Sequence, residues 1–375
     1  MSYLFAVPCM FAVYMMVGRL GLSRAGFAGL SLLFTVALVE YQWFVSGVDA
    51  FIAACLTMAI ANASAWFVDT FLLEDVTREA LTQQLLDGRR ERSFCSRLTH
   101  DYAVRPKDSA NEVQLINTGK WQELAASINK LGPSERQGFY ANLDYSSINE
   151  QALQEAINSF PQDADAHVLM GHVKLCQAKG LGLNPGAKFD EPVALAIADA
   201  FRHFNLALRG TPEDPEALCG LLMAKGFTGL GAGHIRQSLE RLLSADPMHL
   251  HGVVAAARFL VLSTRQANDF VSVVEGAVAG RSDVTLAIAK IIVHAECMAF
   301  IENGVNDSQI IADIYKQLHC YKRETEKFGS WQRDISNNVI AYVMQLIGDK
   351  EEASEFLEKI HGSTSPYPWQ SNSVV

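Results

Sequence analysis

The sequence predicts an all-α protein with an N-terminal three-helix transmembrane region and a C-terminal α-helical repeat (superhelical) domain. Residues 50–68 form an uncharged and almost wholly apolar run, long enough to cross the roughly 30 Å hydrocarbon core of a membrane as a helix. Beyond Asn111, apolar residues recur with the period of a helix, and no long stretch alternates with period two. Three segments of this second region share one pattern of a helix end, a Pro-containing turn and a new apolar helix.

The charge of the chain is divided unevenly between these two regions. Residues 1–68 contain two basic and two acidic side chains, so the net charge of −10 arises entirely from the residues that follow. A domain this acidic does not suit the phosphate backbone of nucleic acid, and we expect no nucleic-acid partner. The seven cysteines are scattered without a CxxC pair, which predicts a reducing compartment, no disulfide framework and no metal site.

We expect three membrane spans, over residues 2–18, 25–44 and 50–68. The first run has no positive residue before its apolar core, which argues against a cleaved signal peptide. Arg19 and Arg24 mark the first loop as cytoplasmic, and the arginines that follow the third span mark the same side again. The sequence therefore predicts a multi-pass protein of the cytoplasmic (inner) membrane, with its N-terminus outside and its large domain in the cytoplasm. The alternative is two spans, with the first run lying on the membrane surface.

Small residues recur at every fourth position of the third predicted span. They are Ala53, Thr57, Ala61 and Ala65, and a stripe of this kind lets two membrane helices approach closely. The stripe packs either within one three-helix hairpin or between copies of the chain, and the second alternative predicts a homo-oligomer. Glu40 is interpreted as a carboxylate at the membrane interface, or else as part of an ion path.

Residues 69–110 are predicted to connect the membrane region to the soluble domain. Apolar residues in their first half have the spacing of an amphipathic helix, whereas residues 101–109 have no period and are predicted to be a linker. Arg89, Arg90 and Arg92 form a basic patch between the two. These arginines contact anionic lipid headgroups, at about 1 kcal/mol each near the surface, or else they lie at a solvated helix end.

The repeats lie within a helical domain predicted over residues 111–362. The recurring segments are residues 156–171, 206–221 and 242–257. Their turns contain Pro161, Pro212 and Pro247, which lie 51 and 35 residues apart. The second interval is close to the period of about 34 residues that is typical of tetratricopeptide repeats, and a Gly-rich insertion at 180–191 lengthens the first.

The end of the chain is predicted to contain one more helical hairpin and a polar tail. Residues 337–360 form the hairpin, with Gly348 and Asp349 at its turn. Residues 363–375 form the tail, which contains the aromatic stretch SPYPWQ. That stretch either docks on a partner or folds back onto the last helix.

Three stretches resemble the tetratricopeptide superfamily and, more narrowly, an uncharacterised bacterial tetratricopeptide-like family. They are GKWQEL, AFRHFNLALRGTPEDPEALCGLL and LLSADPMHLHGVVAAARFL, within residues 119–265. The resemblance implies helical hairpins that stack on one another and offer a concave surface to a peptide or a partner helix. It implies no activity.

The chain contains none of the catalytic motifs with a recognisable spacing. GxSxG, HExxH and a Walker A loop are all absent, and we predict neither catalytic residues nor a cofactor. The glycine-rich stretch 226–233 follows a helix without a preceding strand, so it is interpreted as a turn between helices. His172 and Cys176 would share one helix face, where a histidine packed in the core beside a thiol is favoured over a metal site.

These observations favour a membrane-anchored helical-repeat scaffold or adaptor that binds a protein partner at the cytoplasmic face, in contact with membrane lipids. The alternative is an oligomeric membrane effector or pore, whose repeat domain senses a signal. The identity of the partner does not follow from the sequence.

Overall fold

The computed structural model describes Thr82 and residues 109–181, 190–228, 232–260, 264–298, 308–360 and 366–369. The chain divides into a unit of residues 1–80 and a unit of residues 81–375, and every described residue belongs to the second unit. The three predicted spans and the basic patch of Arg89, Arg90 and Arg92 lie outside the described residues. Within the described part of the chain, no helix combines the length and the apolar character that crossing a membrane requires.

The prediction of an all-α domain is confirmed. The described residues form α-helices joined by short turns and 3-10 helices, and no strand lies among them. The first part of the domain consists of short elements: α5 (Ala110–Asn117), α6 (Trp121–Ile128), α7 (Pro133–Asn142), η3 (Tyr145–Ser147) and α8 (Glu150–Ser159).

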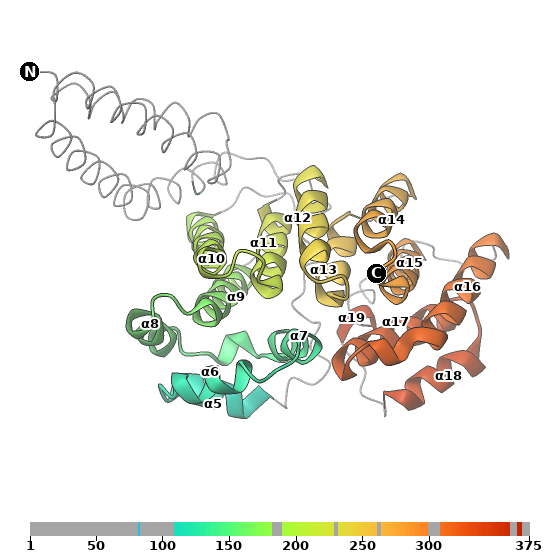
Figure 1. The fold of residues 1–375 in the computed structure, drawn as a ribbon. Coiled ribbons are helices and arrows are strands. Elements are labelled where there is room, and N and C mark those ends of the chain that lie inside the picture. Colours follow the sequence, from blue (N-terminus) through green and yellow to red (C-terminus); the bar gives the residue numbers. More distant parts are fainter. Residues whose placement is uncertain are drawn as a thin grey trace, which may run out of the picture. The chain divides into compact units, whose positions relative to one another are not determined.

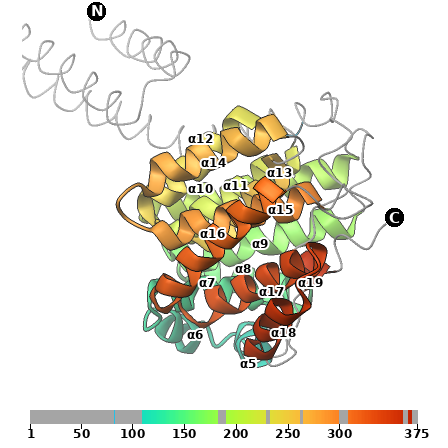
Figure 2. The same cartoon turned by 90° about the vertical axis from the view of Figure 1, so that its right-hand side faces the viewer.

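The helices from α9 to α18 follow one another as helical pairs (Figures 1 and 2). The first helices of the pairs are α9 (Ala164–Gly180), α11 (Pro215–Thr228), α13 (Leu250–Leu260), α15 (Asp283–Met298) and α17 (Ser330–Leu346). The second helices are α10 (Glu191–Gly210), α12 (Ala232–Ala245), α14 (Thr264–Val278), α16 (Ser308–Glu324) and α18 (Lys350–Lys359). Each first helix packs on the first helix of the next pair, so we call these five the row helices.

The row helices begin at intervals of 51, 35, 33 and 47 residues. Two of these intervals are close to a period of about 34 residues, and the other two contain longer connections. Stacked pairs of this kind bury apolar faces that a single pair would leave exposed. The described domain is therefore built from helical repeats of unequal length.

Three of the row helices begin with the same local structure. Pro161, Pro212 and Pro247 each lie in a turn, two residues before the residue that caps the next helix. Asp163 Oδ1 accepts a hydrogen bond from Ala166 N at 3.2 Å, Asp214 Oδ1 from Ala217 N at 2.9 Å, and His249 Nδ1 from Gly252 N at 3.2 Å. These bonds satisfy N–H groups that a helix start leaves without an intrahelical partner. Proline followed by a capping side chain thus fixes where each helix begins.

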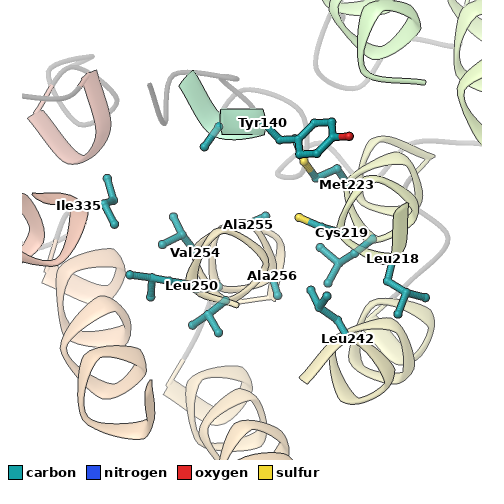
Figure 3. Packing of buried hydrophobic residues seen from close by; sticks show 14 of the residues in the cluster. Tyr140, Leu218, Cys219, Met223, Leu242, Leu250, Val254, Ala255, Ala256 and Ile335 are labelled. Atoms are coloured by element: carbon teal, nitrogen blue, oxygen red, sulfur yellow. The ribbon is translucent and has the colours of Figure 1, made fainter. Parts of the chain in front are cut away.

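The core of the domain is centred on α13. Every residue from Leu250 to Leu260 is buried, including the polar His251 and Arg258, as expected for a helix that is enclosed by other helices. Figure 3 shows Val254 and Ala255 of this helix surrounded by Cys219 of α11, Leu242 of α12 and side chains of α7 and α17. Helices far apart in the sequence therefore meet around α13.

The last hairpin and the aromatic stretch of the tail pack against each other. α17 and α18 are joined by a turn in which Gly348 has a φ of 86°, a value that favours glycine, and Asp349 caps α18. The short helix α19 (Pro366–Trp369) packs on α17, where Trp369 Nε1 donates to Asn338 Oδ1 at 3.1 Å. The aromatic stretch therefore folds back, but onto α17, the first helix of the hairpin, where the prediction named the last helix.

Candidate binding site

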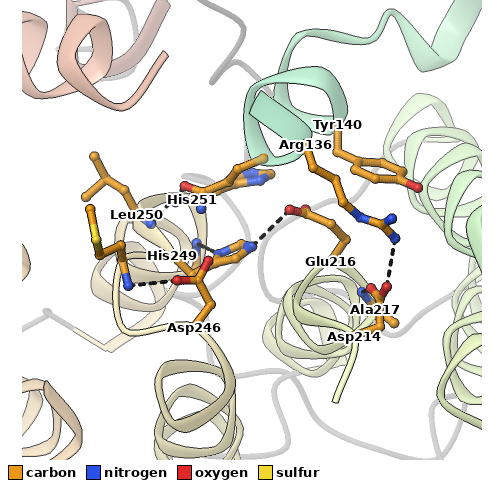
Figure 4. A network of polar contacts seen from close by, with 12 residues as sticks. Arg136, Tyr140, Asp214, Glu216, Ala217, Asp246, His249, Leu250 and His251 are labelled. Carbon is orange, nitrogen blue, oxygen red and sulfur yellow. Dashed lines mark hydrogen bonds and ion pairs between the residues drawn. The ribbon is translucent and has the colours of Figure 1, made fainter. Parts of the chain in front are cut away.

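Helix α7 lies across the beginnings of several row helices. Its side chains reach α9, α11 and α13, and it packs on α17 (Figure 4). The N-terminal end of a helix carries unpaired N–H groups and a partial positive charge, so it attracts acceptor and acidic side chains. Helix α7 contacts these helix starts in two ways. Gln137 accepts hydrogen bonds from N–H groups, and Arg136 pairs with acidic side chains.

Arg136 of α7 joins the starts of α9 and α11. Its Nη2 lies 2.5 Å from Asp165 Oδ1 and 2.7 Å from Asp214 Oδ2. Tyr140 donates its hydroxyl to Asp165 Oδ1 at 2.6 Å. Burial raises the pKa of Asp165 and outweighs the lowering that the Arg136 guanidinium causes. The cation and its two carboxylates therefore compensate one another inside the fold.

Gln137 of α7 connects this helix to the start of α13. This side chain is fully buried, and its Oε1 accepts from Leu250 N at 2.9 Å and from His251 N at 3.3 Å. Next to it, His249 Nδ1 accepts from a backbone N–H, so its proton lies on Nε2, 3.3 Å from Glu216 Oε1. The beginnings of α9, α11 and α13 are thus covered by α7.

A separate pocket of about 540 Å³ lies between α16, the 3-10 helix η4 (Thr325–Lys327), α17 and α18. We call it the α16–α18 pocket. Its lining consists of Tyr321, Lys322, Thr325, Ser330, Arg333, Asp334, Asn337, Phe356 and Lys359. The pocket is thus formed by three helices of the last two helical pairs.

The inner wall of the α16–α18 pocket is a fixed polar surface. Burial raises the pKa of Tyr321 to about 12, so its hydroxyl stays protonated and donates to Asn337 Oδ1 at 2.9 Å. Asn337 is only 7% exposed. Its carboxamide oxygen accepts from Tyr321, and therefore the amide N–H₂ of this lining residue is the group that can still donate a hydrogen bond.

The rim of the α16–α18 pocket carries three basic residues. Lys322 pairs with Glu352 and, at 3.2 Å, with Glu355, whereas Lys359 Nζ lies 2.6 Å from Glu355 Oε1. The hydrogen bond from Lys359 lowers the pKa of Glu355. The third basic residue, Arg333, is exposed and takes part in none of the ion pairs formed among the described residues.

The three prolines that the sequence singles out, Pro161, Pro212 and Pro247, precede row helices and do not line this pocket. Ala53, Thr57, Ala61 and Ala65 lie outside the described residues. Lys322, Arg333, Asn337 and Lys359 form no motif, since their positions in the sequence follow no recognisable spacing. The surface position of the basic three follows from helical periodicity, but their common pocket does not.

Comparison of the chain with protein-family models, with curated proteins and with solved structures finds no match. Among the described residues, no group of three or more His, Cys, Asp or Glu side chains is placed to hold a metal ion.

Proposed function

We propose that the protein is a membrane-anchored helical-repeat scaffold or adaptor, which binds a protein partner at the cytoplasmic face of the membrane. The observation that carries this proposal is the α16–α18 pocket at the end of the stacked helical pairs. Its lining offers amide, hydroxyl, ammonium and guanidinium groups, which suit the recognition of acceptor groups on a ligand. Lys322 and Lys359 are 37% and 43% exposed, so the pocket opens to solvent.

The assignment of the repeats as tetratricopeptide-like belongs to the same proposal. It is supported by the two intervals of 35 and 33 residues between row helices, and by the proline turns that precede them. In a stacked array the last pair has no following pair, which leaves part of its surface able to contact other molecules. Because α7 covers the beginnings of α9, α11 and α13 and contacts α17 through Gln332, we place the partner at the α16–α18 pocket and not at that edge.

Membrane anchoring rests on the charge-free run 50–68 and on the distribution of arginines around it. We expect the full chain to stay in the membrane fraction after extraction with alkaline carbonate, which releases peripheral proteins. Release into the supernatant would argue against the anchor.

The binding function is tested by crosslinking the full chain in intact cells, followed by affinity purification and mass spectrometry. We expect one foreign protein at a constant ratio to the chain. The effector alternative predicts instead that the chain crosslinks mainly to itself, and that Ala53→Leu together with Ala61→Leu abolishes these crosslinks, because bulky residues block the small-residue stripe. Recovery of the chain alone, unaffected by that double change, would contradict both functions.

A further inference from the structure

We infer that the α16–α18 pocket binds an acidic segment of the partner, through carboxylates of Asp or Glu side chains. This inference rests on the proposed function, since it specifies the chemistry of the partner. It starts from the charges at the pocket: Lys322 and Lys359 are paired with Glu352 and Glu355 at the rim, whereas Arg333 takes part in none of the ion pairs formed among the described residues. A ligand that pairs with Arg333 is an anion.

The position of the pocket on α17 adds to the attraction. Ser330 is the first residue of this 17-residue helix, and Arg333 lies in the same first turn. The partial positive charge of a helix N-terminus thus has the same sign as the three cations. The amide of Asn337, 7% exposed, supplies a fixed hydrogen-bond donor on the inner wall. A carboxylate bound at this position would therefore contact both positive charge and hydrogen-bond donors.

Glu355 shows how a carboxylate is held at the rim. Its Oε2 lies 3.2 Å from Lys322 Nζ, and its Oε1 lies 2.6 Å from Lys359 Nζ. Glu355 is 47% exposed, and ion pairs of this kind contribute about 0–1 kcal/mol each. A carboxylate of a partner can therefore replace Glu355 beside the two lysines at little cost in free energy. At Arg333 the partner's carboxylate displaces no carboxylate of the chain, because Arg333 has no ion pair among the described residues.

The remaining features select a peptide with carboxylates over a phosphorylated one. Phe356 forms an apolar part of the lining, with Lys359 Nζ 4.2 Å from the ring centroid, and it suits the methylene groups of an acidic side chain. Asp334 and Glu355 repel a phosphate dianion more strongly than a single carboxylate. The volume of about 540 Å³ accommodates several side chains. An acidic stretch of polypeptide satisfies all three conditions.

The test measures binding of fluorescein-labelled hexaglutamate to the purified full chain by fluorescence anisotropy. We expect Arg333→Gln to weaken binding about tenfold, because a hydrogen bond to a charged group is lost. Glu355→Gln should strengthen binding about threefold, since it removes the competing carboxylate. Lys130→Gln removes one positive charge from the exposed end of the α6–α7 connection, and we expect less than a twofold change there.

Labelled hexalysine should not bind, and a phosphoserine hexapeptide should bind more weakly than hexaglutamate. The inference is overturned if hexaglutamate does not bind, if Lys130→Gln weakens it as much as Arg333→Gln, or if the phosphopeptide binds more tightly. A damaged fold would weaken binding, so the stronger binding expected for Glu355→Gln distinguishes the inference from a loss of structure. If hexaglutamate does not bind but crosslinking of the wild-type chain recovers a foreign partner, the inference fails and the proposed function stands. If the wild-type chain recovers none, the proposed function itself fails.

Discussion

At the scale of single residues, glycines determine how closely the row helices approach α10. The ring of Phe204 in α10 lies between Gly171 of α9 and Gly220 of α11. A Cβ atom would lie 2.6 Å from Phe204 Cε1 if built on Gly171, and 2.1 Å if built on Gly220. Both distances are far below a van der Waals contact, so these helices pack at this distance only because neither position carries a side chain.

We predict that Gly220→Ala destabilises the protein by about 1–3 kcal/mol, because the added methyl group overpacks the contact with Phe204. Chemical denaturation measures the change. Gly276→Ala is the matched control: it also lies in a helix, but its Cβ would have no atom within 4 Å. There the change should stabilise the helix by about 0.5–1 kcal/mol. Equal effects at the two positions would contradict the packing argument.

At the scale of helices, a carboxylate connects α8 to α9. Glu150 Oε1 lies 2.6 Å from Lys174 Nζ, and Glu150 Oε2 accepts from Gln177 Nε2 at 2.5 Å. Burial raises the pKa of Glu150, but these two hydrogen bonds outweigh it, so its pKa is lower in the folded state than in the unfolded one. A lowered pKa contributes stability that is present above the unfolded value and is lost as the pH falls through the folded value.

Glu150→Gln should therefore destabilise the protein at pH 7 and lose this effect in acid. Because Glu150 is 42% exposed, solvent screening limits the effect at pH 7 to about 1 kcal/mol. The difference from the wild type should vanish below the folded pKa, where both side chains are neutral. Urea unfolding between pH 7 and pH 3 measures it, with Glu155→Gln of the same helix as the control. A difference in stability that grows towards acid pH would contradict the stabilising role of the ionised Glu150.

The contact between α7 and α13 is also an interaction of whole elements. Gln137→Leu leaves the N–H groups of Leu250 and His251 buried without their acceptor. It also removes Gln137 Nε2, which has no hydrogen-bond partner, so we expect a net loss of about 1–3 kcal/mol.

Hydrogen exchange should then be faster in the first turn of α13, and denaturation measures the loss of stability. The control is Gln154→Leu on α8, where the side chain is exposed and the expected change is within about 0.5 kcal/mol. Equal losses for the two variants would show that Gln137 does not act as a cap.

At the scale of the described domain, α7 connects helices from both ends of the array. Ser134 of α7 donates to Gln332 Oε1 of α17 at 2.7 Å, and Gln332 Nε2 donates to Met248 O, also at 2.7 Å. Repeats in an ordinary array contact only their neighbours, and their ends can unfold independently. The contact between α7 and α17 joins residues 198 positions apart. We therefore expect the two ends of the array to unfold cooperatively.

Gly138→Val should remove this cooperativity. A Cβ at Gly138 would lie 2.9 Å from Trp331 Cβ, so a branched side chain separates α7 from α17. We expect hydrogen exchange in urea to show α5–α8 opening before α15–α18 in this variant, whereas both open together in the wild type. Gly233→Val in α12, where a Cβ has no neighbour within 4 Å, should keep the common opening. Joint opening of both groups in Gly138→Val would contradict this coupling.

Much of the helical framework could be predicted because it depends on neighbours in the sequence. A proline followed two residues later by Asp163 or Asp214 defines a helix start locally, and Gly348 with Asp349 defines a turn. The sequence also predicts the hairpin of α17 and α18, although α17 begins at Ser330, ahead of the predicted residue 337. Its first turns have few apolar residues, and only the burial of Trp331 and Gln332 against other helices shows that they belong to it.

The sequence by itself determined the all-α class, the turns before the row helices and the acidic character of the domain, because these depend on composition and on residues a few positions apart. Only the tertiary structure decided that α7 covers the beginnings of α9, α11 and α13, and that Lys322, Arg333 and Lys359 share one pocket. These arrangements join residues between 11 and 114 positions apart. Their side chains meet because the packing of the helices around α13 sets their direction, and no local pattern encodes that packing.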